Sequence, residues 1–181
     1  MISQKINKEA SKKNNAAKYA EGYQAPEYLT DLERQFIDHE VSLVPHKSAA
    51  VIEALKIVQH QRGWISDESV SAIAAYLQMS PAEVDSVATF YNLIFRKPVG
   101  RHVILVCDSI SCYVMKYGEI YKALQEKLHI QFGETTSDQC FTLLPNACLG
   151  CCDHAPALMI DNDLYKDLTV DMLERILKQY T

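Results

Sequence analysis

Two close pairs of cysteines, separated by a longer segment, constrain this chain more than any other feature of its sequence. Four residues separate Cys107 from Cys112, and three residues separate Cys148 from Cys152. Two pairs of thiolates suit a metal core that needs two protein ligands on each side. A 2Fe–2S cluster meets this description, because each of its two irons takes two cysteines. The spacing therefore predicts one 2Fe–2S cluster on these four residues, and a protein that carries an electron.

The other two cysteines leave alternatives open. Cys148 and Cys151 form a C-x-x-C, which is the spacing of thioredoxin-type dithiols and of zinc half-sites. A dithiol oxidoreductase using Cys148 and Cys151, and a zinc-stabilised interaction module, are therefore competing hypotheses. Pairing Cys148 with Cys152 also explains the first pair, so we predict that Cys151 is a neighbour of the site and not a ligand. Cys140 is expected to pack as a small apolar residue.

Residues around the cysteines indicate how the site is supported. Gly150 lies between the second pair, where the missing side chain permits a positive φ and lets backbone amides approach the sulfurs. Ser109 and Ser111 lie between the first pair, either as hydroxyl donors or as ordinary loop serines. Four cysteines fill the coordination, so we expect His154 to be a neighbouring or surface histidine.

The composition narrows the class of protein. With 48% apolar and 23% charged residues, the 181-residue chain has the composition of a soluble globular protein. A net charge of −5 argues against nucleic acid as a partner, because phosphate binding needs a basic surface. No apolar run approaches the roughly 20 residues of a membrane helix. Residues 1–26 lack the apolar region of a secretory signal, so we expect a cytoplasmic protein with reduced cysteines.

Apolar periodicity divides the chain into a polar, flexible arm over residues 1–26, a four-helix bundle over residues 27–97 and a mixed domain over residues 98–181. The predicted N-caps of the four helices are Thr30, Ser48, Ser66 and Ser80. Their predicted inward stripes are Leu32, Phe36 and Leu43; Val51, Ala54, Leu55 and Val58; Val70, Ile73, Ala74 and Leu77; and Val84, Val87, Ala88 and Tyr91. The bundle has no catalytic constellation, and we predict that it docks the chain to a partner.

The second domain is predicted to have strands at residues 103–106, 141–144, 157–160 and 164–168. A helix that begins at Cys112 follows the first strand, and a last helix begins after Thr169. The order β-α-β-β-α is typical of a small thioredoxin-like domain, so the whole chain is of α+β class. Cys107 ends the first strand, while Cys148 and Cys152 lie in the loop between the second and third strands. Such loops at strand ends commonly carry chemistry.

Several segments resemble the peripheral 2Fe–2S subunits of bacterial respiratory complex I, the NADH:quinone oxidoreductase. These segments are residues 52–55, 61–64, 87–91, 107–112 and 148–156. The resemblance runs from about Leu29 to the C-terminus. It implies a helical bundle followed by a thioredoxin-like ferredoxin domain, with Cys107, Cys112, Cys148 and Cys152 as the cluster ligands. The position of Cys151 is usually not cysteine in this family.

The resemblance also implies partners and a location. It implies an electron-transfer subunit of the oxidoreductase, whose cluster lies near the FMN of a larger subunit that binds FMN and NADH. The six glycines form neither G-x-G-x-x-G nor a P-loop, which agrees with placing both nucleotides on that partner. The subunit would be peripheral, at the cytoplasmic face of the inner membrane. Related subunits of NAD-linked hydrogenases and formate dehydrogenases are an alternative that these motifs do not separate.

Overall fold

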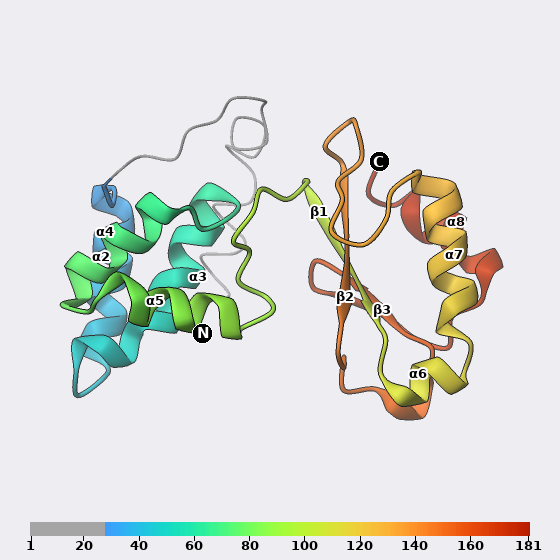
Figure 1. The fold of residues 1–181 in the computed structure, drawn as a ribbon, viewed down its shortest axis with the longest axis horizontal. Coiled ribbons are helices and arrows are strands. Elements are labelled where there is room, and N and C mark those ends of the chain that lie inside the picture. The colour runs from blue at the N-terminus through green and yellow to red at the C-terminus, as the bar shows by residue number, and fades with distance from the viewer. Residues whose placement is uncertain (1–27) are drawn as a thin grey trace. The chain divides into compact units, whose positions relative to one another are not determined.

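The computed structural model describes residues 28–181, so the arm predicted over residues 1–26 lies outside the described residues. The chain divides into two compact units, Met1–Pro98 and Val99–Thr181. The described part of the first unit is helical, and the second unit combines a four-stranded sheet with helices (Figure 1). The predicted mixture of helices and sheet is therefore confirmed.

The helices of the first unit begin where the predicted capping residues lie, with one exception. They are α2 (Asp31–Ser42), the 3-10 helix η3 (Lys47–Ala50), α3 (Val51–Arg62), α4 (Asp67–Leu77) and α5 (Pro81–Phe90). Thr30 and Ser80 form capping boxes, and Ser66 caps α4 with its hydroxyl. The prediction for Ser48 is wrong, because the chain makes the turn of η3 there and α3 follows directly.

Most of the predicted inward residues of this unit are buried. The predicted stripes of α3 and α4 are buried in one hydrophobic core. The prediction for α2 is wrong, because Leu32 and Leu43 are exposed while Glu33 and Ile37 are buried. Tyr91 is exposed as well, since it follows the last residue of α5. The inward face of α2 therefore carries a charged residue that apolar periodicity does not detect.

A buried ion pair explains the position of Glu33. The guanidinium of Arg62 donates to both carboxylate oxygens of Glu33, over 2.7 and 2.8 Å. It also donates to the hydroxyl of Ser69 and to the carbonyl oxygen of Tyr28. Glu33 in turn accepts from the backbone N–H of Thr30 in the capping box. The pair thus joins the start of α2 to the end of α3 and the first turn of α4, with its polar atoms satisfied.

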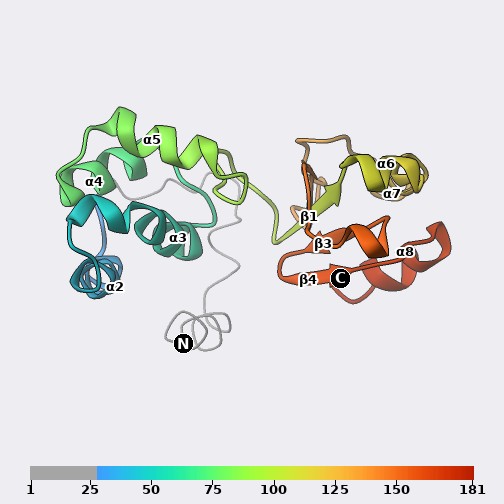
Figure 2. The ribbon, with the colours of Figure 1, turned by 90° about the horizontal axis from the view of Figure 1, so that it is seen from below.

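The second unit is built on a mixed sheet. Its strands are β1 (His102–Cys107), β2 (Phe141–Asn146), β3 (Leu158–Ile160) and β4 (Asp163–Tyr165), in the order β2-β1-β3-β4. Its helices are α6 (Ile110–Val114), α7 (Tyr117–Leu128), the 3-10 helix η4 (Cys152–His154) and α8 (Val170–Leu177). β1 and β2 are parallel, and the other two strand pairs are antiparallel. Figures 1 and 2 show α7 and α8 on the same face of the sheet, where they contact each other.

Three features of this unit differ from the prediction. The fourth strand, predicted at residues 164–168, is only three residues long and spans Asp163–Tyr165. The helix expected to begin at Cys112 is divided into α6 and α7, because Lys116 has a φ of 69°. β2 continues through Pro145 to Asn146 instead of ending before the proline. β2 is at the edge of the sheet and pairs with β1 on one side only. A proline is tolerated there, because it lacks a backbone N–H and such a group is needed on both sides only in an inner strand.

The buried ion pair gives a stability prediction. Glu33→Gln leaves the Arg62 charge buried without its partner and should lower the free energy of unfolding of the helical unit by about 3 kcal/mol. The measurement is urea denaturation followed by the fluorescence of Trp64, the single tryptophan of the chain. Glu53→Gln is the matched control, because Glu53 pairs with Lys56 at the surface and its loss should cost less than about 0.5 kcal/mol. Equal effects of the two substitutions would contradict the prediction.

Candidate metal centre

The parallel pairing of β1 and β2 brings the two cysteine-bearing segments to the same end of the sheet. Cys107 is the last residue of β1 and is in register with Asn146, the last residue of β2. The N–H of Asp108 donates to the carbonyl oxygen of Asn146 at 3.0 Å. The N–H of Cys107 donates to the carbonyl oxygen of Ala157 at 3.1 Å. The loop of residues 147–156 therefore begins and ends beside Cys107, as the prediction required.

The first cysteine pair is buried. Cys107 and Cys112 are each 2% exposed and form a small apolar cluster with Ala155, against which Tyr117 and Leu149 pack. Burial raises the pKa of the Cys112 thiol to about 11, and a hydrogen bond with Cys107 acts in the same direction. A buried thiolate needs a nearby positive charge, which a bound metal supplies. Burial therefore favours the neutral thiol of Cys112, and a bound metal would displace its proton.

The second cysteine pair lies in the loop and is open to solvent. Cys148 and Cys152 are both exposed. Gly150, between them, has a φ of +75°, and its N–H donates to the sulfur of Cys148 at 3.3 Å. The expected positive φ and the approach of a backbone amide to a cysteine sulfur are thus both confirmed. Such N–H groups stabilise the negative charge of a metal-bound sulfur.

Cys151 and His154 complete the loop. Cys151 is 7% exposed, and burial raises the pKa of its thiol. No sequence pattern indicates this burial, because consecutive residues of an irregular loop follow no facing rule. Nδ1 of His154 lies 2.8 Å from a carboxylate oxygen of Asp167, and the backbone N–H of Asp167 donates to the carbonyl oxygen of His154. His154 is therefore a surface histidine that holds the end of the loop, in line with the expectation.

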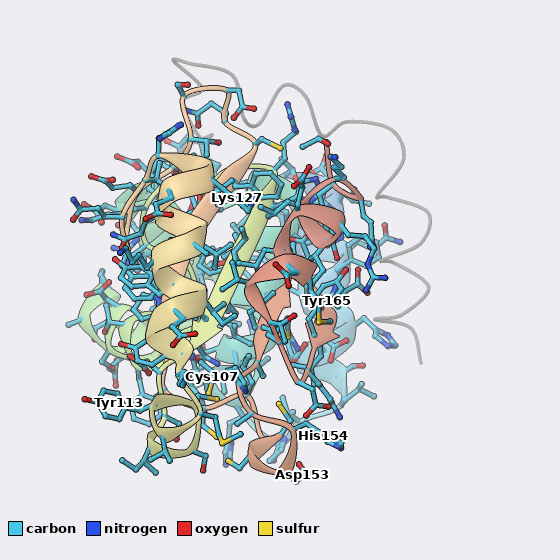
Figure 3. All side chains as sticks on the ribbon, turned by 90° about the vertical axis from the view of Figure 1, so that its right-hand side faces the viewer. Cys107, Tyr113, Lys127, Asp153, His154 and Tyr165 are labelled. Atoms are coloured by element: carbon cyan, nitrogen blue, oxygen red, sulfur yellow. The ribbon has the colours of Figure 1, made fainter. Side chains whose placement is uncertain are left out.

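An apolar surface adjoins the first cysteine pair, and the sequence analysis missed it. Four of its side chains on and next to α6 are exposed: Ile110, Tyr113, Val114 and Met115. Figure 3 shows Tyr113, Cys107, Asp153 and His154 at one end of the unit, with Lys127 toward the other. The signal was the apolar run of residues 113–115 beside Cys112, which resembles the start of a buried helix. We call these four residues the α6 surface.

The donor set fits a two-iron cluster. In the part of the chain from residue 28 onward, no group of three or more His, Cys, Asp or Glu side chains is placed to hold one metal ion. A 2Fe–2S cluster makes a different demand, since each iron takes only two cysteines and shares the sulfides. One pair on β1 and α6 and a second pair on the adjoining loop supply four thiols at one end of the sheet, and all six cysteines of the chain are free.

Comparison with known proteins identifies the class to which this fold and site belong. A family model described as thioredoxin-like 2Fe–2S ferredoxin matches residues 37–181. The chain therefore belongs to the family of thioredoxin-like 2Fe–2S ferredoxins, and its cofactor is one 2Fe–2S cluster. Within residues 28–181, no helix has the length and apolar character needed to cross a bilayer.

Individual relatives and a solved structure show which members of this family the chain is similar to. The chain is similar to one subunit of the NADH-quinone oxidoreductase of Pseudomonas aeruginosa and to the same subunit of Escherichia coli K12, with 49% identity to each over 152 residues. Each alignment covers 84% of this chain and 92% of the relative. A crystal structure of an NAD+-reducing NiFe hydrogenase has a similar fold, with a TM-score of 0.61 and 22% identity. That match covers 72% of this chain and 22% of the hydrogenase chain.

The unequal exposure of the thiols predicts an order of alkylation after iron is removed. In iron-free, folded protein at neutral pH, iodoacetamide should modify Cys148 and Cys152 before Cys107 and Cys112. The first two are exposed, whereas burial and the raised pKa keep Cys112 a thiol until the pH approaches about 11. Mass spectrometry of timed digests measures the order. Faster reaction of Cys107 or Cys112 would contradict the described burial.

Proposed function

We propose that this chain is the electron-transfer subunit of an NADH:quinone oxidoreductase and binds its cluster through Cys107, Cys112, Cys148 and Cys152. The observation that carries the proposal is the convergence of both cysteine-bearing segments at one end of the parallel β1–β2 pair. The relatives with 49% identity support the same setting, because their name is that of a subunit of this oxidoreductase. When bound, the cluster takes up and releases one electron at a time.

The residues of the chain hold and shield this site. Cys107 and Cys112 are supplied by β1 and α6, so their positions follow from the packed sheet and helix. The loop contributes Cys148 and Cys152, with the N–H of Gly150 donating to the sulfur of Cys148. Buried apolar neighbours exclude water from the first pair. The side of the site with Cys107 and Cys112 is therefore shielded from water. The side with Cys148 and Cys152 is exposed to solvent, where an electron-transfer partner can approach.

The proposed partner is the subunit that binds FMN and NADH, together with further subunits of the peripheral arm, on the cytoplasmic side of the inner membrane. The α6 surface supports a protein partner near the cluster, since four neighbouring apolar side chains are exposed beside Cys112. For residues 27–97 we propose a four-helix bundle that docks the chain, and for residues 98–181 the ferredoxin domain. The equivalent subunit of an NAD-linked hydrogenase or formate dehydrogenase is the alternative setting.

A dithiol oxidoreductase is the rival from another class. Its support is that Cys148 is exposed and Cys151 is buried, as an attacking and a resolving thiol would be. Cys151→Ser separates the two functions, because it would abolish dithiol chemistry and leave four cysteines for the cluster. The dithiol oxidoreductase would be favoured if the wild-type protein contained no iron and reduced insulin, and if Cys151→Ser abolished this activity.

Loss of a proposed ligand from the rigid pair tests the site. Cys107→Ala in the full chain should lose the visible absorption of the cluster and its iron, because the first iron is left with one thiolate. Iron and acid-labile sulfide analysis and the EPR spectrum after reduction are the measurements. Cys140→Ala is the matched control, because Cys140 is also buried in this unit but its sulfur contacts the carbonyl oxygen of Tyr180. A fully loaded Cys107→Ala protein would contradict the assignment.

A charge on the α6 surface tests the partner site. Ile110→Glu should release the chain from its flavoprotein partner without loss of the cluster, because a carboxylate in an apolar interface is desolvated without a counter-charge. Co-purification of the tagged chain from its native host measures assembly, and iron content reports the cluster. Leu164→Glu is the matched control on β4, where Leu164 is also an exposed apolar residue. Unchanged assembly of the Ile110→Glu protein would exclude the α6 surface from the interface.

A further inference from the structure

Asn146, the last residue of β2, has a buried polar side chain beside the cysteines. It is 5% exposed and in register with Cys107, the last residue of β1. Because side chains alternate between the two faces along each strand, residues that pair in register lie on the same face of the sheet. Burying an amide is unfavourable unless it forms hydrogen bonds. The partners of Asn146 therefore indicate what it does at this edge of the sheet.

Two hydrogen bonds of Asn146 join the segments that contain the cysteines. Its backbone carbonyl oxygen accepts from the N–H of Asp108, the residue that follows Cys107. Its side-chain Nδ2 donates to the carbonyl oxygen of Cys148 over 3.2 Å. This one residue thus contacts the backbone next to Cys107 on one side and Cys148 itself on the other.

The bond to the Cys148 carbonyl oxygen also affects the surroundings of the Cys148 sulfur. The peptide group between Cys148 and Leu149 is planar, so a hydrogen bond to its oxygen fixes the orientation of the whole group. The next amide along the chain belongs to Gly150, and its N–H donates to the Cys148 sulfur over 3.3 Å. Cys148 is therefore held at its backbone oxygen by Asn146 and at its sulfur by Gly150, although its side chain is exposed.

The contact requires a hydrogen-bond donor at position 146. A carbonyl oxygen has no proton to give, so the NH2 group of the Asn146 amide must supply it. An aspartate of the same shape would place a carboxylate against the carbonyl oxygen of Cys148. An apolar side chain would remove the hydrogen bond altogether. The chemistry of an amide, and not only its size, is what links this strand end to Cys148.

We propose that Asn146 is a positioning residue of the metal centre, which fixes Cys148 and the hydrogen bond that its sulfur accepts from Gly150. This inference rests on the four-cysteine site proposed above. Hydrogen bonds to a cysteine ligand stabilise the more negative, reduced state and raise the reduction potential. Groups that orient a metal ligand also strengthen metal binding, by about 10- to 100-fold. Asn146 therefore contributes to both the potential and the retention of the cluster without binding iron itself.

Asn146→Val tests this role in the full chain, loaded in the cell and purified anaerobically, because valine suits a strand but cannot donate. The protein should still bind the cluster, but with a lower midpoint potential and shifted g-values in a redox titration followed by EPR. The chelator concentration that removes half of the iron should fall about tenfold. Asn146→Ala removes the same amide without adding a branched side chain, so it should shift the potential and the g-values in the same direction.

Thr142→Val is the matched control. Thr142 is also buried on β2, and its hydroxyl accepts from the N–H of Gly100 near the start of the strand. Its loss should lower the stability to urea and leave the potential and the g-values as in the wild type. Far-UV circular dichroism shows that each variant is folded.

A second measurement does not depend on the cluster. In the iron-free, folded chain, NMR should show faster hydrogen exchange of the Gly150 amide in the Asn146 variants than in the wild type or Thr142→Val. Wild-type potential, g-values and Gly150 exchange in both Asn146 variants would overturn the proposal. Equal changes in Thr142→Val would also overturn it, because the effect would then be one of stability alone. A Cys107→Ala protein that keeps its cluster would instead overturn the four-cysteine site, so the two failures are distinguishable.

Discussion

The metal centre depends on the parallel pairing of β1 with β2. In a parallel pair the carboxyl ends of both strands lie at the same edge of the sheet, so the segments that follow them meet there. Cys107 ends β1, and the loop with Cys148 follows β2 directly. An antiparallel arrangement would put the two loops at opposite ends of the strands. The proposed site therefore combines residues about forty positions apart in the chain through this pairing.

The two strands are also joined closely at the opposite end, just before β1 begins. The N–H of Gly100 donates to the hydroxyl oxygen of Thr142 at 2.6 Å, and a Cβ on Gly100 would come within 3.0 Å of the carbonyl oxygen of Gln139. This close contact leaves little room for a side chain at Gly100, just before the pairing of His102 with Phe141. A shift of one residue would move the end of β2 by about 3.3 Å relative to Cys107. It would also turn its buried side chains to the opposite face.

Local rules predicted much of the helical unit because its caps and stripes are local features. The capping boxes of α2 and α5 and the inward stripe of α4 follow from residues three or four positions apart. The inward face of α2 did not follow, since Glu33 is buried by a partner 29 positions away, Arg62. Apolar periodicity treats a glutamate as a surface residue. The burial of Glu33 depends on its ion pair with Arg62, and local sequence patterns do not reveal such a long-range pair.

At the candidate metal site, too, the sequence predicted some features and not others. Cysteine spacing predicted the ligand pairs but not which loop cysteine is buried. The intervals between Cys107, Cys112, Cys148 and Cys152 indicated two ligand pairs, because the number of residues between ligands limits how they can share a metal. Burial follows other rules. A strand repeats every two residues and a helix every 3.6, so periodicity indicates the inward side of each. The loop that carries Cys151 and Cys152 has no period, and with Gly150 at φ +75° either sulfur could face the core. Which of two consecutive thiols is buried is therefore decided by the packing of the loop on β1, and only a structure reveals it.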